Sequence, residues 1–520
     1  MISTDTEYLA RTSGLGRSEW PLVALGLSLA LSIRLFGIAE QSLWVDEGAT
    51  MLFAQSPWSE LLGPIARNET NPPGYYALMK LWIAVAGTSE LAMRLPSALA
   101  SSLCVVPLYF LCLRATGRRC AVLSVLLFAI SGIQVEYAQD ARAYALLSLL
   151  FATALWAAGG FVDAIVRSEA QIGWLIVFSV ASATLPYLHM TGFLAIVVVF
   201  VYVVAALAAS GRFSTTALVR LSIAGLVTFV VASPMLLLLW VQLHQEVSPV
   251  AWIGKPSLGE TMWIYRLTFG HFHLPEIGWS RFAEPRLWAD FVLVAAAGIS
   301  ALFAVRQGNR HVIGLIAAIV LLMVLFHTVS QKIPVILPRT ILFGTVLVFA
   351  IVGSGIASIR NRRAALFVAA TVIGFQGINL TVFFHERLPK EDWRGVIGWA
   401  TTAHRAGDSI VLFRPSVGGL PLLEKYWTGA APEAIFAVIQ PGLQIDLIGL
   451  QLVPRVTLLE AEQPCPALAG FRRVFVLSRI GNTTSLLEPF RAAMIARGAE
   501  LVHEQRSGVL RLHLWEGLTC

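Results

Sequence analysis

Residues 191–209, TGFLAIVVVFVYVVAALAA, decide the fold class of this chain. They contain no charged side chain, and a helix of about 20 such residues crosses the hydrocarbon core of a bilayer. The whole chain shares this character, since 57% of its 520 residues are hydrophobic and only 13% are charged. Soluble domains carry about twice that charged fraction. The sequence therefore predicts a polytopic α-helical membrane protein.

Ten further segments have the length and hydropathy of a membrane span: 21–39, 95–113, 121–138, 143–161, 172–188, 221–241, 289–305, 312–330, 341–358 and 364–383. We therefore expect about eleven transmembrane helices. The apolar run that begins at Leu22 has no small-residue cleavage site, so it indicates a retained first span rather than a signal peptide.

Short basic connections set the expected orientation. One alternating set of loops carries Arg11 and Arg17, then Arg114, Arg118 and Arg119, then Arg167, Arg212 and Arg220, Arg306 and Arg310, and Arg360, Arg362 and Arg363. The positive-inside rule places this set in the cytoplasm together with the N terminus. An odd number of spans then places the C terminus outside, which in a Gram-negative cell is the periplasm. The net charge of +7 reflects these clusters and does not indicate a nucleic-acid partner.

The composition changes from Glu386 onward. Short apolar stretches such as Ser409–Phe413 and Arg473–Leu477 alternate with polar, helix-compatible segments such as Leu486–Arg497. Apolar runs of that length predict strands or core helices rather than spans. We therefore expect a soluble extracytoplasmic α/β domain after the transmembrane part.

The expected domains are a transmembrane domain at 1–384, which includes a long first outer loop at 40–94, and the α/β domain at 385–520. Cys465 and Cys520 lie in the second domain. They could form a disulfide if that domain faces an oxidising compartment. The five cysteines show no metal-binding pattern.

Adjacent carboxylates follow the first predicted span, in Trp44-Val45-Asp46-Glu47. One interpretation is a solvated turn that caps the next helix. The functional alternative is a general base whose pKa is raised by apolar walls. In the same loop, Asn71-Pro72-Pro73-Gly74-Tyr75-Tyr76 predicts a rigid extended entry into an amphipathic segment at Tyr75–Ala86. By itself this motif is a structural device, which could fold the loop over the carboxylates.

Charged residues also interrupt the outer ends of the predicted spans. Asp140 and Arg142 lie in a largely apolar stretch, where a charged side chain is costly and therefore indicates function. The alternative is that Arg142 merely forms an ion pair with Asp140 or Glu136 that ends the helix. His189, Lys332 and Arg339 lie on the same expected face, and each alone is typical of an interfacial anchor. Together with the carboxylates they suggest a phosphate-plus-base site, with Arg142, Lys332 and Arg339 on a lipid phosphate.

Several motifs are absent from the sequence: a Walker A loop, a dinucleotide glycine fingerprint, HExxH and Asp-x-Asp. A metal-bound nucleotide-sugar donor is therefore not indicated. No cofactor is required by the residues present and no metal site is predicted, although a divalent ion could assist.

In their order along the chain and their expected place at one membrane face, the motifs resemble those of the GT-C class of integral-membrane glycosyltransferases. The similarity is to the bacterial branch of the dolichyl-phosphate-mannose protein mannosyltransferases and lipid A aminoarabinose transferases. The matching pieces are Trp44–Glu47, Asn71–Pro73 with Tyr75 and Tyr76, Arg94–Ser97, Gln139–Tyr144, Leu188-His189 with Thr191-Gly192, Pro338-Arg339 and Lys390–Arg394.

The resemblance implies that Asp46 is the catalytic base, that Glu47 supports it, and that Arg142 and Arg339 bind the donor phosphate. It also implies transfer of a sugar from a polyprenyl-phosphate donor to a lipid, lipopolysaccharide or other glycan, or protein at the periplasmic face of the inner membrane. Asn71 stands where relatives often have histidine, so no metal or proton-shuttle role follows there. The alternatives are a glycolipid transporter or flippase, an oligosaccharide ligase with a pyrophosphate-linked donor, and a non-catalytic scaffold.

The expected topology is directly testable by cysteine labelling or reporter fusions in intact cells. Sites near Arg118 and Arg362 should react as cytoplasmic, because their loops are basic. Sites near Gly63, Pro275 and Thr428 should react as external. An internal signal at Thr428 would contradict the topology, because it would separate the α/β domain from the outer face.

Overall fold

The computed structural model describes residues 18–169, 172–245, 253–269, 306–386, 390–413, 416–438, 456–479, 484–507 and 509–520, with isolated positions at 452 and between 295 and 302. Its residues form two compact units. Unit 1 comprises Met1–Phe36, Leu95–Leu243 and Val250–Arg387, and unit 2 comprises Gly37–Arg94, His244–Pro249 and Leu388–Cys520. The segment that holds Asp46 therefore belongs to the same unit as the C-terminal residues.

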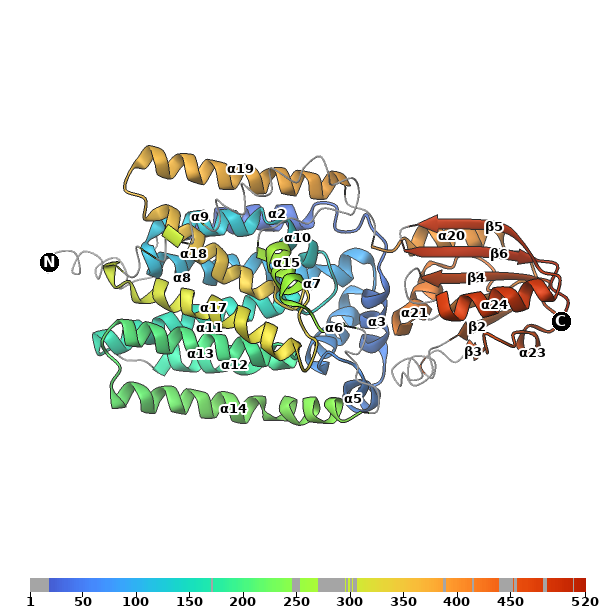
Figure 1. Ribbon diagram of the computed structural model, residues 1–520, viewed down its shortest axis with the longest axis horizontal. Helices are drawn as coiled ribbons and strands as arrows, with labels where there is room; N and C mark the ends of the chain where they lie inside the picture. Colours follow the sequence, from blue (N-terminus) through green and yellow to red (C-terminus); the bar gives the residue numbers. More distant parts are fainter. Residues whose placement is uncertain are drawn as a thin grey trace. The chain divides into compact units, whose positions relative to one another are not determined.

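Unit 1 is helical (Figure 1). Its helices are α2 (Trp20–Leu35), the greater part of α7 (Glu90–Leu103), α8 (Val105–Thr116), α9 (Arg118–Ala129), α10 (Gly132–Ala138), α11 (Tyr144–Arg167), α12 (Ile172–Leu188), α13 (Gly192–Ala209), α14 (Thr215–Leu243), α15 (Leu258–Phe269), α17 (Arg310–Ser330), η3 (Leu342–Gly344), α18 (Thr345–Ala357) and α19 (Arg362–Glu386). Ten of the eleven predicted spans coincide with helices in this series. The predicted span at 289–305 and much of the predicted loop at 242–288 lie outside the described residues.

Six described helices are long and apolar enough to cross a membrane, or seven if the bent pair α9 and α10 counts as one span. The helices α2, α12 and the pair η3–α18 are apolar but shorter. A polytopic helical architecture is thus confirmed, whereas the count of eleven stays a prediction.

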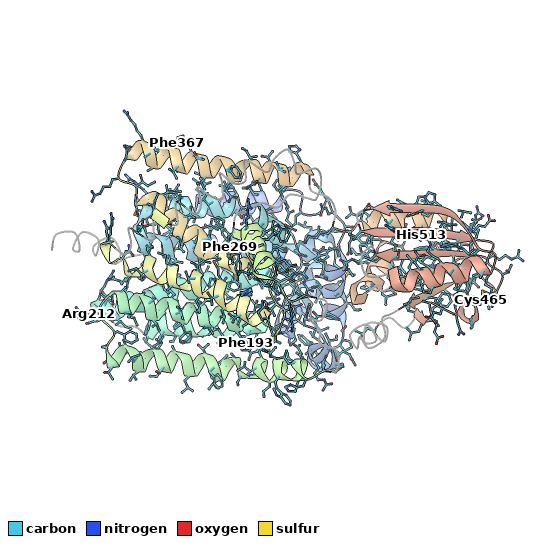
Figure 2. The ribbon with its side chains drawn as sticks, in the orientation of Figure 1. Phe193, Arg212, Phe269, Phe367, Cys465 and His513 are labelled. Atoms are coloured by element: carbon cyan, nitrogen blue, oxygen red, sulfur yellow. A yellow bond between two sulfur atoms is a disulfide. The ribbon has the colours of Figure 1, made fainter. Side chains whose placement is uncertain are left out.

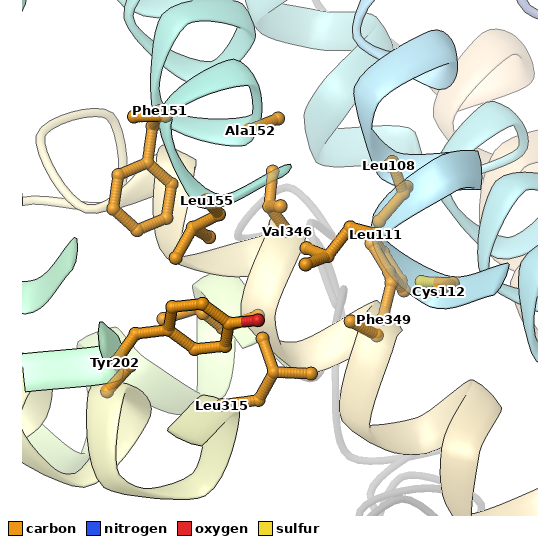
Figure 3. Packing of buried hydrophobic residues seen from close by; sticks show 14 of the residues in the cluster. Leu108, Leu111, Cys112, Phe151, Ala152, Leu155, Tyr202, Leu315, Val346 and Phe349 are labelled. Carbon is orange, nitrogen blue, oxygen red and sulfur yellow. The ribbon is translucent and has the colours of Figure 1, made fainter. Parts of the chain in front are cut away.

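The core of unit 1 is a layer of interlocked apolar side chains from helices that are distant in the sequence. Figure 3 shows Leu108 of α8, Phe151 and Leu155 of α11, Leu315 of α17 and Val346 of α18 around one packed region. All five are almost completely buried. Close packing of this kind holds helices together in a membrane, where lipid is as apolar as the side chains.

Helices α14 and α19 lie at the periphery of unit 1 (Figure 1). Both carry exposed apolar side chains. Phe367, labelled in Figure 2, is 74% exposed, and Leu226 and Leu237 are 64% and 68% exposed. An exposed apolar surface on this scale indicates contact with another apolar phase. A lipid environment satisfies it.

Helices α9 and α10 meet at an angle of 58°. The bend leaves carbonyl groups at the end of α9 without helical donors. The buried guanidinium of Arg34 supplies donors in their place. It donates hydrogen bonds to the carbonyls of Phe128 (3.3 Å) and Ala129 (3.1 Å) and to Ser101 Oγ (2.7 Å). Arg34 thereby stabilises the break that precedes Asp140 and Arg142.

A second charged cluster joins the ends of three helices in unit 1. Asp163 at the end of α11 pairs with Arg114 of α8 (2.9 Å), with Arg310 (2.9 Å) and with His311 (2.8 Å) of α17. Chain direction places this cluster at the opposite end of α11 from Tyr144. Two of the arginines expected in basic loops therefore lie together, away from the turns that carry Arg142 and His189.

Unit 2 contains a six-stranded mixed sheet in the order β3-β2-β1-β4-β6-β5. Its elements are α20 (Trp393–Ala403), β1 (Ser409–Phe413), α21 (Ser416–Tyr426), β2 (Ala434–Val438), β3 (Val456–Leu458), α23 (Cys465–Leu468), β4 (Arg473–Arg479), α24 (Thr484–Ala496), β5 (Glu500–Ser507) and β6 (Leu510–Glu516). Strands β1 to β4 are mutually parallel, and β6 runs antiparallel to β4 and β5. The predicted α/β fold is confirmed. Ser409–Phe413 and Arg473–Leu477, for which strands and core helices were both open, lie in strands.

Helices cover both faces of this sheet. Phe490 and Met494 of α24 pack in one cluster with Val474 and Val476 of β4. Phe475 points to the opposite face, because side chains alternate along a strand, and it contacts Trp399 of α20. A disulfide between Cys465 and Cys520 links α23 to the end of the chain.

The segment 40–94, expected as a loop, is mostly helical. It contains α3 (Val45–Gln55), α4 (Trp58–Glu60), η1 (Leu61–Ile65), α5 (Ala66–Asn68) and α6 (Pro73–Ala86), and α7 begins at Glu90. Pro73 at the first position of α6 fits the predicted rigid entry. The helices are stable here because their apolar faces are buried, including Phe53 of α3 against Tyr76 of α6 (5.1 Å between ring centres).

Helix α3 packs against α21 at a pair of glycines. A Cβ atom on Gly418 would lie 1.7 Å from the carbonyl oxygen of Val45, and one on Gly48 would lie 2.3 Å from that of Gly418. Only glycine permits this approach of two backbones. The first turn of α3 is therefore fixed against the helix that follows β1.

Candidate active site

The first turn of α3 places its two carboxylates in different environments. Asp46 is half-buried, whereas Glu47 is completely buried. Glu47 accepts from the N–H of Trp44 (3.2 Å), and both of its oxygens accept from the Arg94 guanidinium, at 2.7 Å and 2.6 Å. Glu47 is thus committed to a buried bidentate ion pair, while Asp46 keeps access to solvent.

Arg94 also ties down the chain that leads into α3. It donates to the carbonyls of Ile38, Gln41 and Ser42, each at 2.9 Å. Its planar fork satisfies several acceptors at once, which a lysine ammonium could not do in the same geometry. The position of Asp46 therefore depends on Arg94 at the start of α7.

A third carboxylate, Glu391, lies beside the same turn. Its Oε2 accepts from the N–H of Val45 (2.9 Å) and from the indole N–H of Trp393 (2.7 Å). Its Oε1 pairs with Arg479 at the end of β4 (2.8 Å). Burial raises the pKa of Glu391, with Asp46 contributing in the same direction, and Arg479 and the two N–H donors oppose this only in part.

A further network holds the residues just before α3. Tyr426 of α21 accepts from the N–H of Leu43 (2.8 Å) and donates to Glu90 (2.7 Å). Arg394 pairs with Glu90 (2.7 Å). The Ser42 hydroxyl donates to the carbonyl of Glu391 (2.8 Å). Residues 42–45 are therefore held directly by the C-terminal part of unit 2.

The predicted residues of the Asn71 motif gather around Glu69. The amide of Asn71 donates to Glu69 Oε1 (2.9 Å), and the Tyr76 hydroxyl donates to the same oxygen (3.2 Å). Tyr75 and Tyr76 are both buried and their rings lie 6.1 Å apart. This cluster orients Glu69, which follows the end of α5.

In unit 1, the turn between α10 and α11 buries Asp140 and Arg142. Arg142 donates its N–H to the carbonyl of Asp140 (2.8 Å), and its own carbonyl accepts from Ser97 (3.1 Å). Gln139 anchors the turn by donating to the carbonyls of Arg34 (2.9 Å) and Phe36 (2.7 Å). The guanidinium of Arg142 is thus carried by a turn fixed to α2 and α7.

His189 lies in the turn between α12 and α13 and joins this group. Its Nδ1 lies 2.7 Å from the Thr191 hydroxyl and accepts from the N–H of Thr191 (3.2 Å). Thr191 donates to the carbonyl of Thr340, next to Arg339. Burial, followed by the positive charges of Arg142 and Arg339, lowers the pKa of His189. The imidazole is therefore neutral between two guanidinium charges.

Two of the predicted cations, Arg142 and Arg339, both interact electrostatically with His189. Arg339 and Asp140 also both interact electrostatically with Tyr137, so Asp140 shares this environment. Lys332 is exposed beyond the end of α17, and its described contacts do not join it to this group. Among the residues that the structure describes, no group of three or more His, Cys, Asp or Glu side chains is placed to hold a metal ion.

Sequence reasoning assigned no site role to Arg94, Glu391, Glu69 or Arg34. Arg94 and Glu391 lie inside the motifs Arg94–Ser97 and Lys390–Arg394. For Arg94, a charge within an apolar neighbourhood is a signal that could have indicated a site role. Glu391 pairs with Val45 from 346 positions away, so no local pattern could reveal it.

Comparison with known proteins supports the architecture. Residues 70–240 match the profile of the family described as dolichyl-phosphate-mannose-protein mannosyltransferase. The apo structure of ArnT from Cupriavidus metallidurans is similar over 96% of this chain and 98% of that chain, with a TM-score of 0.62 and 14% identity. Its complex with undecaprenyl phosphate gives a TM-score of 0.61 at the same identity and coverage.

AglB, the oligosaccharyltransferase of Archaeoglobus fulgidus, is similar in its complex with an inhibitory peptide and a dolichol-phosphate. The TM-score is 0.52 at 12% identity, over 89% of this chain and 69% of that chain. The resemblance to GT-C glycosyltransferases is confirmed. At these identities it concerns the fold. A search of curated protein sequences finds no match.

The contrast between Glu47 and Asp46 predicts different effects of the same chemical change. Glu47→Gln should lower the stability of the protein by about 3 kcal/mol or more, because it leaves the buried Arg94 charge without its partner. Asp46→Asn should lower stability less than Glu47→Gln does, since Asp46 is half-buried whereas Glu47 is completely buried. Thermal unfolding of both variants in the same detergent measures the difference. Equal midpoints for Glu47→Gln and wild type would contradict the structural role of the ion pair.

Proposed function

We propose that this protein transfers a glycosyl group from a polyprenyl-phosphate-linked donor to an acceptor hydroxyl or amine at the outer face of the membrane. The observation that carries the proposal is the division of roles in the first turn of α3. Glu47 is committed to Arg94, and Asp46 is held rigidly but remains accessible. The likeness in fold to ArnT, solved with undecaprenyl phosphate, supports the donor class.

Asp46 acts as the general base in this proposal. The oxygen or nitrogen of the acceptor attacks the anomeric carbon, and its proton passes to the Asp46 carboxylate. The bond between the anomeric carbon and the phosphate oxygen breaks, and the electron pair leaves with the polyprenyl phosphate. One direct displacement of this kind inverts the anomeric centre and forms no covalent enzyme intermediate.

Arg142 and Arg339 bind the donor phosphate in this proposal, and Lys332 is a further candidate. The two guanidinium groups stabilise the charge that accumulates on the leaving phosphate. His189 is neutral, because its pKa is lowered, so it can offer a hydrogen bond without adding a third charge. Asp140, Asn71, Tyr75 and Tyr76 are further candidates for the site.

We further propose an inner-membrane location with a cytoplasmic N terminus and a periplasmic C-terminal domain. The Cys465–Cys520 disulfide supports an oxidising compartment for that domain. The separation of the Asp163 cluster from the Arg142 turn supports two chemically distinct membrane faces. The acceptor is a glycan, lipid or protein, and no cofactor is required, although a divalent ion could assist.

The role of Asp46 is tested by Asp46→Asn. Asparagine is nearly isosteric but cannot take a proton at neutral pH, so transfer should fall by roughly 10²-fold or more. Transfer is measured with radiolabelled polyprenyl-phosphate sugars and membrane extracts as acceptor. The variant should still elute normally in detergent and bind the lipid donor. An active Asp46→Asn enzyme would remove Asp46 as the base.

The role of the arginines is tested by replacing Arg142 or Arg339 with alanine. Each change should reduce donor use by roughly 10²-fold, because one stabilising donor to the leaving phosphate is lost. Lysine should restore activity only in part, since it lacks the planar two-donor geometry. Arg114→Ala serves as the matched control at the Asp163 cluster. If both alanine variants kept wild-type donor dependence, the phosphate would have to bind elsewhere.

A further inference from the structure

The short helix α10 is held at both ends by one residue of α2, Arg34. Where α9 stops, before α10 begins, the Arg34 guanidinium donates to the carbonyls of Phe128 (3.3 Å) and Ala129 (3.1 Å). Where α10 stops, the side chain of Gln139 donates to the backbone carbonyl of Arg34 (2.9 Å). Helix α2 lies beside both α9 and α10 (Figure 1). The segment between the break and the turn of Arg142 is therefore fixed by a single residue.

Helix α7 supports both ends of this segment from one face. Its Ser101 hydroxyl accepts from Arg34 Nε (2.7 Å), and its Ser97 hydroxyl donates to the carbonyl of Arg142 (3.1 Å). Residues four positions apart are neighbours on a helix surface, so the two contacts have a fixed spacing. Helix α10 has only seven residues, Gly132–Ala138, which make about 10 Å of helix. Because so short a helix bends little, a shift at the break moves the turn that carries Arg142.

Arg34 carries its charge in an environment where charge is costly. Its side chain is completely buried. Its partners among the described residues are three carbonyl oxygens, the Ser101 hydroxyl and the face of the Phe128 ring (5.2 Å), and none of them is a carboxylate. An ionisable residue at such a place indicates function more than packing. What arginine supplies is a planar group that reaches several freed carbonyls at once, which a broken helix needs inside a membrane.

We propose that Arg34 is a positioning residue for the donor-phosphate site, which sets the place of Arg142 by fixing the break before α10. Arg34 does not itself bind the phosphate, because its Nε and both of its Nη atoms already donate within the protein. This inference rests on the proposed function of Arg142. A displacement of about 1 Å at a group that contacts the reacting atoms can lower the rate by about 10²-fold. A residue that holds Arg142 in place therefore affects transfer without touching a substrate.

A double-mutant cycle between Arg34 and Arg142 tests this inference, because residues that act through one another do not have additive effects. Arg34→Met removes every guanidinium donor and keeps an unbranched apolar side chain. It should weaken the binding of a radiolabelled polyprenyl phosphate to the full-length protein in detergent by about tenfold, since Arg142 is no longer held. In an Arg142→Ala background, the same change should alter the dissociation constant by less than about twofold. A purely structural role would lower the unfolding temperature without this dependence on Arg142.

Two further variants separate the geometry from the charge. Arg34→Lys keeps the charge but cannot reach both carbonyls and Ser101 together, so it should weaken binding nearly as much as Arg34→Met. Ser101→Ala keeps the guanidinium and removes one of its anchors, so it should weaken binding less, and again only while Arg142 is present. Ser101→Ala takes the place of Arg34→Met in the cycle if the latter protein does not fold. Arg114→Met is the matched control, because it removes a largely buried arginine that pairs with Asp163 (2.9 Å) in the same unit. It should leave the dissociation constant unchanged.

Equal losses of affinity with and without the Arg142 side chain would overturn the inference, because Arg34 would then act independently of Arg142. Unchanged affinity in a folded Arg34→Met protein would overturn it as well. Unchanged affinity in Arg142→Ala alone would instead defeat the proposed phosphate site, and the role of Arg34 would fall with it. The single Arg142→Ala variant therefore distinguishes a failure of the proposed function from a failure of the role of Arg34.

Discussion

The buried ion pair between Glu47 and Arg94 is the constraint on which the candidate site depends. Removing both charges from water costs several kcal/mol per ion unless their hydrogen bonds are satisfied. The structure satisfies them with two short contacts between the partners and with three backbone carbonyls on residues 38–42. A shift of any of these groups would leave a buried charge without a hydrogen-bond partner. The backbone at Glu47 is therefore fixed, and so is the position of its neighbour Asp46.

The C-terminal α/β part acts on the same turn from the other side. In open parallel sheets, ligands bind beyond the carboxyl ends of the strands where the strand order reverses. Here β1 and β4 are the neighbours at such a point. Helix α21 follows β1 and meets Val45 at Gly418, and Arg479 at the end of β4 reaches Glu391. The position that a ligand occupies in related topologies is therefore taken by the chain's own α3.

The parts that sequence could predict are those set by local pattern. Long apolar runs predicted helices such as α13, and the short apolar runs that form β1 and β4 were predicted as strands or core helices rather than spans. The carboxylates at 46–47 and the charges at 140–142 were visible because charge beside a span is costly. Within 40–94 the amphipathic segment that forms α6 was predicted, but the extent of the other helices was not, because their stability comes from tertiary contacts such as Phe53 with Tyr76. Glu391 was missed because packing alone brings it to Val45.

The charge balance around His189 matches the proposed chemistry of the donor. A polyprenyl-phosphate sugar is a phosphodiester with one negative charge, and the released polyprenyl phosphate is a monoester that carries up to two. If Arg142 and Arg339 bind the phosphate as proposed, they would therefore interact more strongly with the leaving phosphate than with the bound donor, which is the condition for stabilising a transition state. A protonated His189 would add a third cation and hold the product more tightly. Burial and the charges of Arg142 and Arg339 keep the imidazole neutral, so in the proposed site the contacts that favour bond cleavage would still allow the lipid phosphate to leave.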